Sequence, residues 1–302
     1  MPLKFNDKLI AIDLPTYNVT VLPSSNGSAT ATPSRGVPGT IVSLSNTPDQ
    51  GYVLDGYQLT GSSLIDADKF MIKKSDVSVQ PYFIPKVPID LDFLYQAKDF
   101  DGSKIPNKAI NPTFGDYLQA GTITKNGSGS ECYLSNASSQ NNYLYVDLTA
   151  SQLTAIKALA GTTYTWFFRV ANTSGYGGIM STRNGDSNFI YMIRSNGSQL
   201  QVHNSAGRDL GSNFSLVSGN VFKVRISGGN YYAKNLTNGS EWSITDNYTK
   251  AMTNRMKTFY AGAGTGGSES ILAAFYGMAG IPRDTTAEED ELMKSCLLSQ
   301  SV

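Results

Sequence analysis

Aromatic and planar polar side chains occur in or beside predicted turns of the second half of the chain. Aromatic faces stack on sugar rings, and guanidinium, amide and carboxylate groups form paired hydrogen bonds with sugar hydroxyls. These residue types therefore predict a glycan-binding site, although several of them could instead pack within a sheet. The candidate residues are Tyr176, Arg183, Asn184, Asp186, Tyr231 and Trp242.

The sequence predicts no catalytic site, so we expect a protein that is not an enzyme. Retaining sugar hydrolysis needs two carboxyl groups about 5 Å apart. No predicted strand carries the Glu-x-Asp-x-x-Glu pattern that would supply them. The single histidine, His203, has no Gly-x-Ser-x-Gly motif to act with. The run Glu288–Glu291 lies at the start of a predicted helix, where acidic residues offset the helix dipole.

Charge and cysteine content exclude further classes of protein. Lys and Arg total 24 against 24 Asp and Glu, so neither nucleic acid nor an anionic membrane surface is an expected partner. No segment approaches the roughly 20 apolar residues of a membrane helix, which argues against membrane insertion. Cys132 and Cys296 lie far apart in a chain with one histidine, which excludes a Cys/His zinc cluster. No cofactor is predicted.

The composition and the first residues of the chain indicate where the protein works. Low charge with many Ser, Thr, Asn, Gly and Tyr residues is typical of proteins that work outside a cell. Lys4, Asp7 and Lys8 interrupt the apolar start, so no signal peptide is predicted. We therefore expect a virion-surface protein that is made in the host cytoplasm and released by lysis. The alternative is a secreted chain from which the signal has been trimmed.

Alternating apolar residues predict short strands throughout Thr163–Ile281. In Val221–Ile226, the residues Phe222, Val224 and Ile226 fall on one side of an extended chain, and the two residues between them are basic. Gly-Gly and Asn-Gly pairs separate such segments and favour tight turns. The pattern predicts an antiparallel all-β sandwich.

Two capping boxes predict helices beside the sheets. Thr149–Gln152 precedes apolar residues at helical spacing, and Thr285–Glu288 precedes a second apolar stripe that includes Cys296. The second stripe predicts that the C-terminal helix lies on the sandwich. Cys296 is then a small buried side chain rather than a reactive thiol.

Residues 1–16 are predicted to form an N-terminal arm. The segment is too short for a core of its own, yet it carries the large apolar side chains Phe5, Leu9, Ile10, Ile12 and Leu14. We expect the arm to dock on other virion proteins through these side chains. The alternative is that the segment is the first strand of the following domain.

Residues 17–84 resemble a known repeat. Their segments are YNVTVLPSSNGSATAT, GTIVSLSN, GYVLDGYQLTG and DVSVQPYF. The order and spacing are similar to those of a small all-β repeat of bacterial surface proteins and phage structural proteins, which is related to the internalin-type B repeats. The resemblance implies a spacer or adhesion-stalk module with no catalytic residues.

Residues 85–302 resemble the concanavalin A-like domains of laminin-G type. The matching segments, in order, are DLDFLYQAKDF, YLYVDL, YTWFFRVANTSGYGGIMST and FKVRISGGNYYAKNLTNGSEW, followed by a closing strand and a terminal helix. The resemblance implies a jelly-roll sandwich with a short C-terminal helix.

Domains of laminin-G type often hold one calcium ion at a sandwich edge, which leaves a calcium (Ca2+) site open in this chain. Oxygen ligands from separate loops leave no local signature in a sequence. The residues considered lie in predicted loops and are Asp99, Asp101, Asp186 and Asp209.

These observations predict an all-β protein with a small β repeat module and a concanavalin A-like jelly roll, in which recognition is confined to the second module. We expect a non-enzymatic bacteriophage virion surface protein, as a capsid decoration or a tail fibre component, that binds glycans of the host surface or its surroundings. One alternative is a secreted bacterial carbohydrate-binding or glycoside-hydrolase accessory protein. Another is a purely structural decoration protein without a ligand. Assembly of identical chains into a homo-oligomer stays open.

Overall fold

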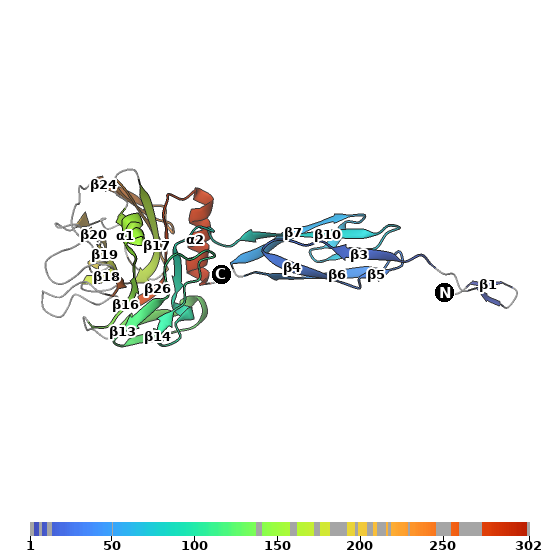
Figure 1. Ribbon diagram of the computed structural model, residues 1–302, viewed down its shortest axis with the longest axis horizontal. Coiled ribbons are helices and arrows are strands. Elements are labelled where there is room, and N and C mark those ends of the chain that lie inside the picture. The colour runs from blue at the N-terminus through green and yellow to red at the C-terminus, as the bar shows by residue number, and fades with distance from the viewer. Residues whose placement is uncertain are drawn as a thin grey trace. The chain divides into compact units, whose positions relative to one another are not determined.

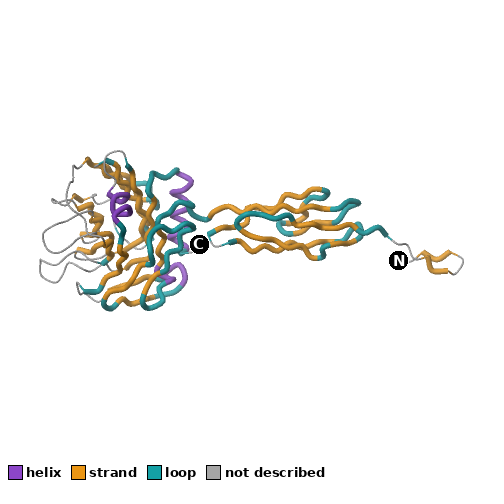
Figure 2. The backbone as a smooth tube through the Cα atoms, viewed as in Figure 1, coloured by secondary structure: helices purple, strands orange, loops and turns teal. Residues whose placement is uncertain are grey.

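The computed structural model of the chain divides into two compact units, Met1–Lys86 (unit 1) and Val87–Val302 (unit 2). The division follows Lys86, whereas the sequence places it after Ile84. Both units consist mainly of β-strands, and the described α-helices belong to unit 2 (Figures 1 and 2). The structure describes residues 3–5, 8–10, 14–49, 51–136, 141–157, 162–171, 176–181, 192–196, 199–203, 208–209, 216, 219–228, 230–245, 255–259 and 274–300.

Unit 1 is built of short strands: β1 (Leu3–Phe5), β2 (Lys8–Ile10), β3 (Tyr17–Val21), β4 (Gly27–Thr32), β5 (Arg35–Gly36), β6 (Ile41–Pro48), β7 (Tyr52–Thr60), β8 (Leu64–Asp66), β9 (Lys69–Met71) and β10 (Val77–Pro85). Strands β3, β5, β7 and β10 form one sheet, β4, β6, β8 and β9 form another, and β1 pairs with β2. Alternation along β6 buries Val42 and Leu44 and leaves Ile41 and Ser43 exposed. The buried pair packs with Phe70 of β9 in the core of this unit.

The sheets of unit 2 have more strands than those of unit 1. Its elements are β11 (Phe93–Gln96), η1 (Ala97–Asp99), β12 (Lys104–Ile105), β13 (Tyr117–Ala120), β14 (Ile123–Asn126), η2 (Gly129–Glu131), β15 (Tyr133–Asn136), β16 (Tyr143–Asp147), α1 (Ala150–Lys157), β17 (Thr163–Ala171), β18 (Tyr176–Ser181), β19 (Met192–Asn196), β20 (Gln199–His203), β21 (Arg208–Asp209), β22 (Val221–Ser227), β23 (Asn230–Asn235), β24 (Glu241–Thr245), β25 (Arg255–Thr258), β26 (Ala274–Ile281) and α2 (Ala287–Ser299).

Two sheets carry these strands. The first, called the β17 sheet below, has the order β14-β15-β26-β17-β22-β23-β24, and β11 also pairs with β26. The second, called the β16 sheet below, has the order β12-β13-β16-β25-β18-β19-β20-β21. Neighbouring strands in both sheets run antiparallel, for example β17 with β22 and β16 with β25.

One hydrophobic core joins the two sheets of unit 2. Trp166 and Phe222 of the β17 sheet pack in the same buried cluster as Leu144 and Met256 of the β16 sheet. Helix α1 adds Ile156 to this cluster. Two sheets that share one core form a sandwich, so the predicted all-β sandwich is confirmed.

Helix α2 lies against the opposite face of the β17 sheet (Figure 1). Strand β17 is buried on both faces, because Trp166 points into the main core while the next residue, Phe167, packs under the helix. Met293 and Cys296 of α2 belong to the same cluster as Phe167. The prediction that the apolar stripe of the C-terminal helix lies on the sandwich, with Cys296 buried, is therefore confirmed.

The two helices differ in how well their starts were predicted. At α1 the Thr149 amide donates to Gln152 Oε1 at 2.7 Å, as the predicted capping box requires. At α2 the box is formed by Thr286 and Glu289, one residue later than predicted. The hydroxyl of Thr285 instead donates to Asp290 Oδ1 at 2.6 Å. Neither described helix has the length and apolar character that crossing a membrane requires.

Candidate functional site

The predicted glycan-binding residues occupy three kinds of position. Arg183, Asn184 and Asp186 lie outside the described residues. Tyr176 begins β18, and the structure describes its backbone pairing with β19 but not its side chain. Tyr231 is described fully and is only 4% exposed.

Tyr231 and Trp242 face the interior of unit 2. Tyr231 of β23 belongs to the main core, so its ring offers no open face for a sugar. Trp242 of β24 lies opposite the buried Ala233 and packs partly buried against the same core. Both residues lie in strands, where alternate side chains face the core. Tyr231 and Trp242 occupy the positions that face inward.

A different group of side chains lies on the outer face of the β16 sheet, where one member is exposed and the others are partly buried. Leu144 and Val146 of β16 and Met256 of β25 point into the core, so the alternate residues lie toward the other face, although Tyr143 also packs partly buried against the core. We call this group the β16–β25 patch. It consists of Tyr143, Tyr145, Asp147, Arg255 and Lys257.

The pairing of β16 with β25 brings opposite charges face to face. Asp147 lies directly across from Arg255, and Tyr145 lies across from Lys257. Arg255 donates to both carboxylate oxygens of Asp147, from Nε at 2.6 Å and from Nη2 at 2.9 Å. The pair stays accessible, because 35% of the arginine side chain and 52% of the aspartate side chain are exposed. These charge-assisted bonds raise the pKa of Arg255 and fix the planar guanidinium.

Each tyrosine of the patch lies beside a cation. The Arg255 Cζ atom is 4.1 Å from the centre of the Tyr145 ring, and the Lys257 Nζ atom is 4.9 Å from the centre of the Tyr143 ring. The two ring centres are 5.9 Å apart with the planes at 61°. Diagonal neighbours on paired strands are within reach of such long side chains, and the ring faces attract the cations. The strand register therefore holds both rings in defined orientations.

The electrostatic surroundings of Lys257 differ from those of Arg255. Partial burial lowers the pKa of Lys257, and the positive charge of Arg255 lowers it further, while Asp147 acts in the opposite direction. Both main causes disfavour the protonated form of the amine.

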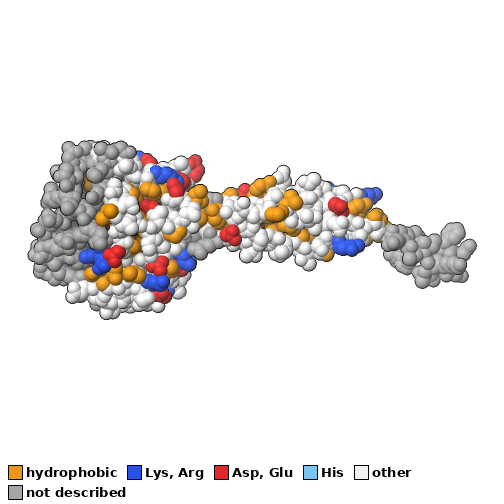
Figure 3. Space-filling view, viewed as in Figure 1, with side chains coloured by type: hydrophobic (Ala, Val, Ile, Leu, Met, Phe, Trp, Pro, Cys, Tyr) orange, Lys and Arg blue, Asp and Glu red, His pale blue; other side chains and the backbone are white. Residues whose placement is uncertain are grey.

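Apolar and polar neighbours on β13 extend the patch. Leu118 lies across from Tyr145 and is 37% exposed. Lys104 of β12 lies across from Leu118 and pairs with Asp116 at 2.7 Å. Figure 3 shows basic, acidic and hydrophobic side chains side by side over the part of unit 2 where Figure 1 labels β16.

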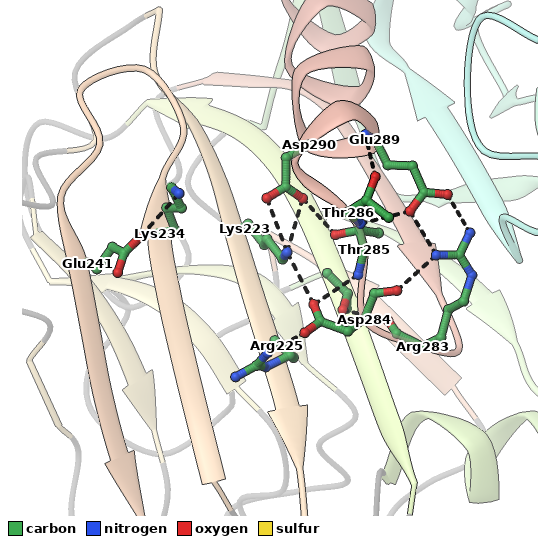
Figure 4. Close-up of polar contacts among 11 residues, drawn as sticks. Lys223, Arg225, Lys234, Glu241, Arg283, Asp284, Thr285, Thr286, Glu289 and Asp290 are labelled. Carbon is green, nitrogen blue, oxygen red and sulfur yellow. Dashed lines mark hydrogen bonds and ion pairs between the residues drawn. The ribbon is translucent and has the colours of Figure 1, made fainter.

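A second polar cluster lies where α2 begins on the β17 sheet (Figure 4). Lys223, whose side chain is 5% exposed, reaches Asp290 at 3.0 Å and Asp284 at 3.2 Å. Arg225 also pairs with Asp284. Arg283 donates to Glu289 of α2, with Nη2 at 2.6 Å from Oε1. Every cation in this cluster contacts a carboxylate, so its role is to attach the helix to the sheet.

Arg283 of the second cluster also reaches the first residues of unit 2. Its Nη2 donates to Asp90 Oδ1 at 2.8 Å, and its Nε donates to the other carboxylate oxygen. These bonds lower the pKa of the Asp90 carboxyl, and the bonds from Arg283 to Glu289 lower the pKa of that carboxyl as well. The cluster therefore holds two segments in place that are far apart in sequence.

A shallow hollow of about 710 Å³ lies between helix α2 and the short helix η2. Its described lining has serine hydroxyls and one ion pair but no aromatic ring, which a sugar would need for stacking. The lining residues are Ser130, Glu291, Lys294, Ser295, Leu298 and Ser299. The β16–β25 patch is therefore the better candidate site.

The residues considered for calcium do not form a common site in the described part of the chain. The Asp101 carboxylate accepts hydrogen bonds from the amide and hydroxyl of Ser103, so it closes a turn. Asp99 lies in η1, and Asp209 lies in β21, where its side chain is not described; Asp186 is outside the described residues. No group of three His, Cys, Asp or Glu side chains that could hold a metal occurs among the described residues. The calcium site stays a prediction.

The sequence analysis missed the β16–β25 patch, although part of its signal was present. In Tyr143–Asp147 the two tyrosines and the aspartate alternate with Leu144 and Val146, which places them on one side of a strand. Nothing local shows that residues 255–258 pair with this strand across more than a hundred positions.

Comparison with protein families concerns unit 1. Residues 17–86 match the model of the divergent InlB B-repeat domain. The predicted resemblance of this region to internalin-type B repeats is therefore confirmed. No curated protein sequence matches the chain.

Comparison with solved structures concerns the fold. A mutant of Trypanosoma rangeli sialidase displaying trans-sialidase activity matches with a TM-score of 0.50 and 8% identity over 70% of this chain. A T. rangeli sialidase matches with a TM-score of 0.46 and 9% identity over 72% of this chain. The binding domain of botulinum neurotoxin DC in complex with SialylT matches with a TM-score of 0.48 and 8% identity over 69%.

This chain covers 34% of each of these sialidases and 52% of the neurotoxin binding domain. At such low identity, the likeness to the sialidase mutant concerns fold and does not extend to activity. The chain thus combines a region similar to the divergent InlB B-repeat domain with a β-sandwich whose fold is similar to part of that sialidase.

Proposed function

We propose that the chain is a non-enzymatic, glycan-binding surface protein of a bacteriophage virion, in which unit 2 binds the glycan and unit 1 is a spacer. The β16–β25 patch carries the proposal. It places two partly buried tyrosine rings 5.9 Å apart on the outer sheet face, each beside a cation, and the cation beside Tyr145 also holds the accessible carboxylate of Asp147.

The patch supplies both interactions that sugar binding needs. The aromatic rings provide apolar faces for the C–H side of a pyranose, and Arg255 and Asp147 provide donors and acceptors for its hydroxyls. Because the ion pair and the ring contacts already hold these groups, little side-chain freedom is lost on binding. The open sheet face nevertheless limits affinity, so a single contact is of order 1 mM and attachment depends on many copies per particle.

The carboxylate described in the patch supports binding rather than hydrolysis. Glycoside hydrolysis uses a pair of carboxyl groups about 5 to 9.5 Å apart on either side of the scissile bond. Among the described side chains of the patch, Asp147 is the one carboxylate, and both of its oxygens accept hydrogen bonds from Arg255. An aspartate held in this way is suited to orient a hydroxyl rather than to act as acid and base in turn.

The composition of unit 1 supports a spacer role. Residues 17–86 are similar to a repeat module, and exposed positions of its strands carry small polar side chains such as Thr30, Ser43 and Ser45. Such small side chains add little contact area, although unit 1 also exposes larger apolar side chains such as Ile41, Ile65 and Tyr82.

The virion location is supported by the extracellular character of the composition and by the resemblance of unit 1 to repeats of phage structural proteins. We propose that the arm, residues 1–16, attaches the protein to other virion proteins. Deleting residues 1–16 should leave a folded protein that no longer joins particles, measured by mass spectrometry of purified virions. Unfolding of the truncated protein would contradict the role of the arm.

Glycan binding is tested with the full-length protein displayed as multimers on a glycan array. We expect wild-type protein and Tyr82→Ala to bind the same glycans and Tyr145→Ala to lose at least ten-fold in signal. Tyr82 is an exposed tyrosine of unit 1 and serves as the matched control. Equal binding by Tyr145→Ala and wild type would place the site elsewhere. Absence of binding by all three proteins would favour a purely structural decoration protein.

A further inference from the structure

We propose that unit 1 binds a second copy of this chain, through antiparallel pairing of strand β7 of one copy with β7 of the other. The inference goes beyond glycan binding, because it assigns a partner to the proposed spacer. Three features carry it: the free edge of β7, the order of its inward and outward side chains, and two polar side chains near its middle. A dimer presents two β16–β25 patches, which raises the effective concentration for a second glycan contact.

Strand β7 lies at one end of its sheet, whose order is β5-β3-β10-β7 (Figure 1). It is nine residues long, and within the described part of the chain its strand partner is β10 alone. The other edge of such a strand presents backbone N–H and C=O groups with which a further strand can pair. Residues 52–60 include neither proline nor lysine, which commonly block this kind of pairing.

A β-bulge divides β7 into two halves. Tyr82 of β10 pairs with Gly56, and the following residue of β10, Phe83, pairs with Leu54. Asp55 is therefore the extra residue of the bulge, and Asp55 and Gly56 together oppose Tyr82. Because side chains alternate along a strand, the extra residue shifts the alternation of one half by one position relative to the other half.

The shift makes the order of faces on β7 the same from either end. Tyr57 and Leu59 pack partly buried against the core of unit 1, and Leu54 is half-buried. The exposed residues, which point outward, are Val53, Asp55, Gln58 and Thr60. When Asp55 and Gly56 count as one outward position, residues 53–60 run out, in, out, in, out, in, out, with Tyr57 at the centre.

A second β7 matches this order. When two copies pair antiparallel about a two-fold axis at Tyr57, Leu54 lies across from Leu59 of the second copy, and Val53 lies across from its Thr60. Inward side chains then meet inward ones, and outward side chains meet outward ones, in both halves. A strand with uninterrupted alternation would match one half of β7 and turn its side chains to the wrong face in the other half. The bulge thus selects a partner with the same bulge.

Gln58 and Asp55 complete the match. The Tyr82 hydroxyl donates to Gln58 Oε1 at 2.7 Å, which leaves the Gln58 Nε2 group as a donor. The same pairing places Gln58 across from Asp55 of the second copy, whose exposed carboxylate accepts this bond. A charge on an edge strand disfavours partners that cannot match it. Here two equivalent hydrogen bonds match it, one on each side of the axis.

Sedimentation velocity of the full-length protein over a concentration series tests the pairing. We expect wild type to change from monomer to dimer as concentration rises. Gln58→Glu still accepts the bond from Tyr82 but faces Asp55 with a like charge, so it should raise the dimer dissociation constant about ten-fold or more. Asp55→Lys/Gln58→Glu should restore dimerisation, because each pair across the axis then has opposite charges. Thr20→Glu is the matched control, since Thr20 is exposed on β3, inside the same sheet, and it should dimerise as wild type does.

A cross-link tests the register. In Val53→Cys/Thr60→Cys, the new cysteines of different copies lie across from each other, so oxidised glutathione should yield a covalent dimer. Val53→Cys alone should not form one, because its two copies lie at opposite ends of the paired strands. The natural Cys132 and Cys296 are buried.

A protein that stays monomeric at all concentrations would overturn the inference. It would leave glycan binding standing, because that proposal is tested with imposed multimers. A dimer that Gln58→Glu does not weaken, or that Val53→Cys alone cross-links, would also overturn the inference. The cross-link decides the question independently of how well Gln58→Glu folds.

Discussion

Arg255 lies between Tyr145 and Asp147, with its Cζ atom 4.1 Å from the tyrosine ring centre and its Nε atom 2.6 Å from the aspartate carboxylate. One side chain thus orients an aromatic ring and an acid on the neighbouring strand. Because both partners belong to β16, a shift of the β16–β25 register by one residue would turn the whole patch to the other face. The site therefore depends on strand pairing rather than on loop conformation.

Arg255→Lys should weaken glycan binding about ten-fold while changing stability by less than about 1 kcal/mol. Lysine cannot form the two-bond fork with Asp147 or stack flat on Tyr145, but exposed ion pairs contribute little to stability. Binding to the array glycans and urea denaturation measure the two effects. Arg35→Lys, in unit 1, is the control; loss of several kcal/mol in Arg255→Lys would mean that the pair is mainly structural.

Lys223→Met should destabilise unit 2 by about 3 to 5 kcal/mol, because it leaves the carboxylate of Asp290 without its buried cation. The Lys223 side chain is 5% exposed and the Asp290 side chain 12% exposed. The double variant Lys223→Met/Asp290→Leu should recover much of this loss, since no uncompensated charge remains. Urea denaturation compares the two, and equal stability of the single and double variants would contradict the account.

The hydrogen bonds of Arg283 with Asp90 and Glu289 should make the free energy of unfolding decrease in acid. Its hydrogen bonds lower the pKa of Asp90 and of Glu289 from their ordinary values of 3.8 and 4.5. A carboxyl whose pKa is lowered in the folded state stabilises the protein above its ordinary pKa, and this contribution is lost as pH falls through the lowered pKa. The free energy of unfolding of wild type should therefore decrease as pH falls below about 4.5.

Arg283→Met should show a smaller decrease over the same pH range, because both carboxyls then titrate closer to their ordinary values. Arg35→Met, which leaves these two carboxyls untouched, should keep the wild-type slope. Denaturation series between about pH 5 and pH 2 supply the comparison. Identical slopes for all three proteins would show that Arg283 does not control the titration.

The two units should unfold through separate cores. Phe70 is fully buried in unit 1 and Phe222 is fully buried in unit 2, and they belong to different hydrophobic clusters. Phenylalanine to alanine in a core costs about 3 to 5 kcal/mol. Calorimetry should show that Phe70→Ala lowers one transition and Phe222→Ala lowers another. A single transition that both variants lower equally would contradict independent cores.

The sequence predicted local features well where a short pattern determines them. The alternation in Val221–Ile226 predicted a half-buried strand, and the Thr149 capping box predicted the start of α1. The box at α2 was displaced by one residue because two threonines are adjacent. The structure shows which threonine caps the helix: Thr286 accepts from the Glu289 amide, while Thr285 donates to Asp290.

The site was harder to predict because it depends on non-local pairing. Tyr231 was expected in or beside a turn, with packing in a sheet as the alternative; β23 begins at Asn230, so the tyrosine falls in the strand and alternation buries it. The next residue, Tyr232, lies on the other face, with its ring centre 4.9 Å from Arg225 Cζ. Prediction of the β16–β25 patch would have needed the information that Asp147 and Arg255 are cross-strand neighbours. No local sequence pattern contains that information.

The most direct test of the central claim is to observe which tyrosine rings contact a bound sugar. The chain has 17 tyrosines, whose ring signals can be followed by NMR in ring-labelled protein and assigned with single Tyr→Phe variants. When an array-selected saccharide is added to the full-length protein, we predict shifts in the ring signals of Tyr143 and Tyr145, with those of Tyr82 and Tyr231 unchanged. Saturable binding that shifts other rings and leaves Tyr143 and Tyr145 unchanged would contradict the account.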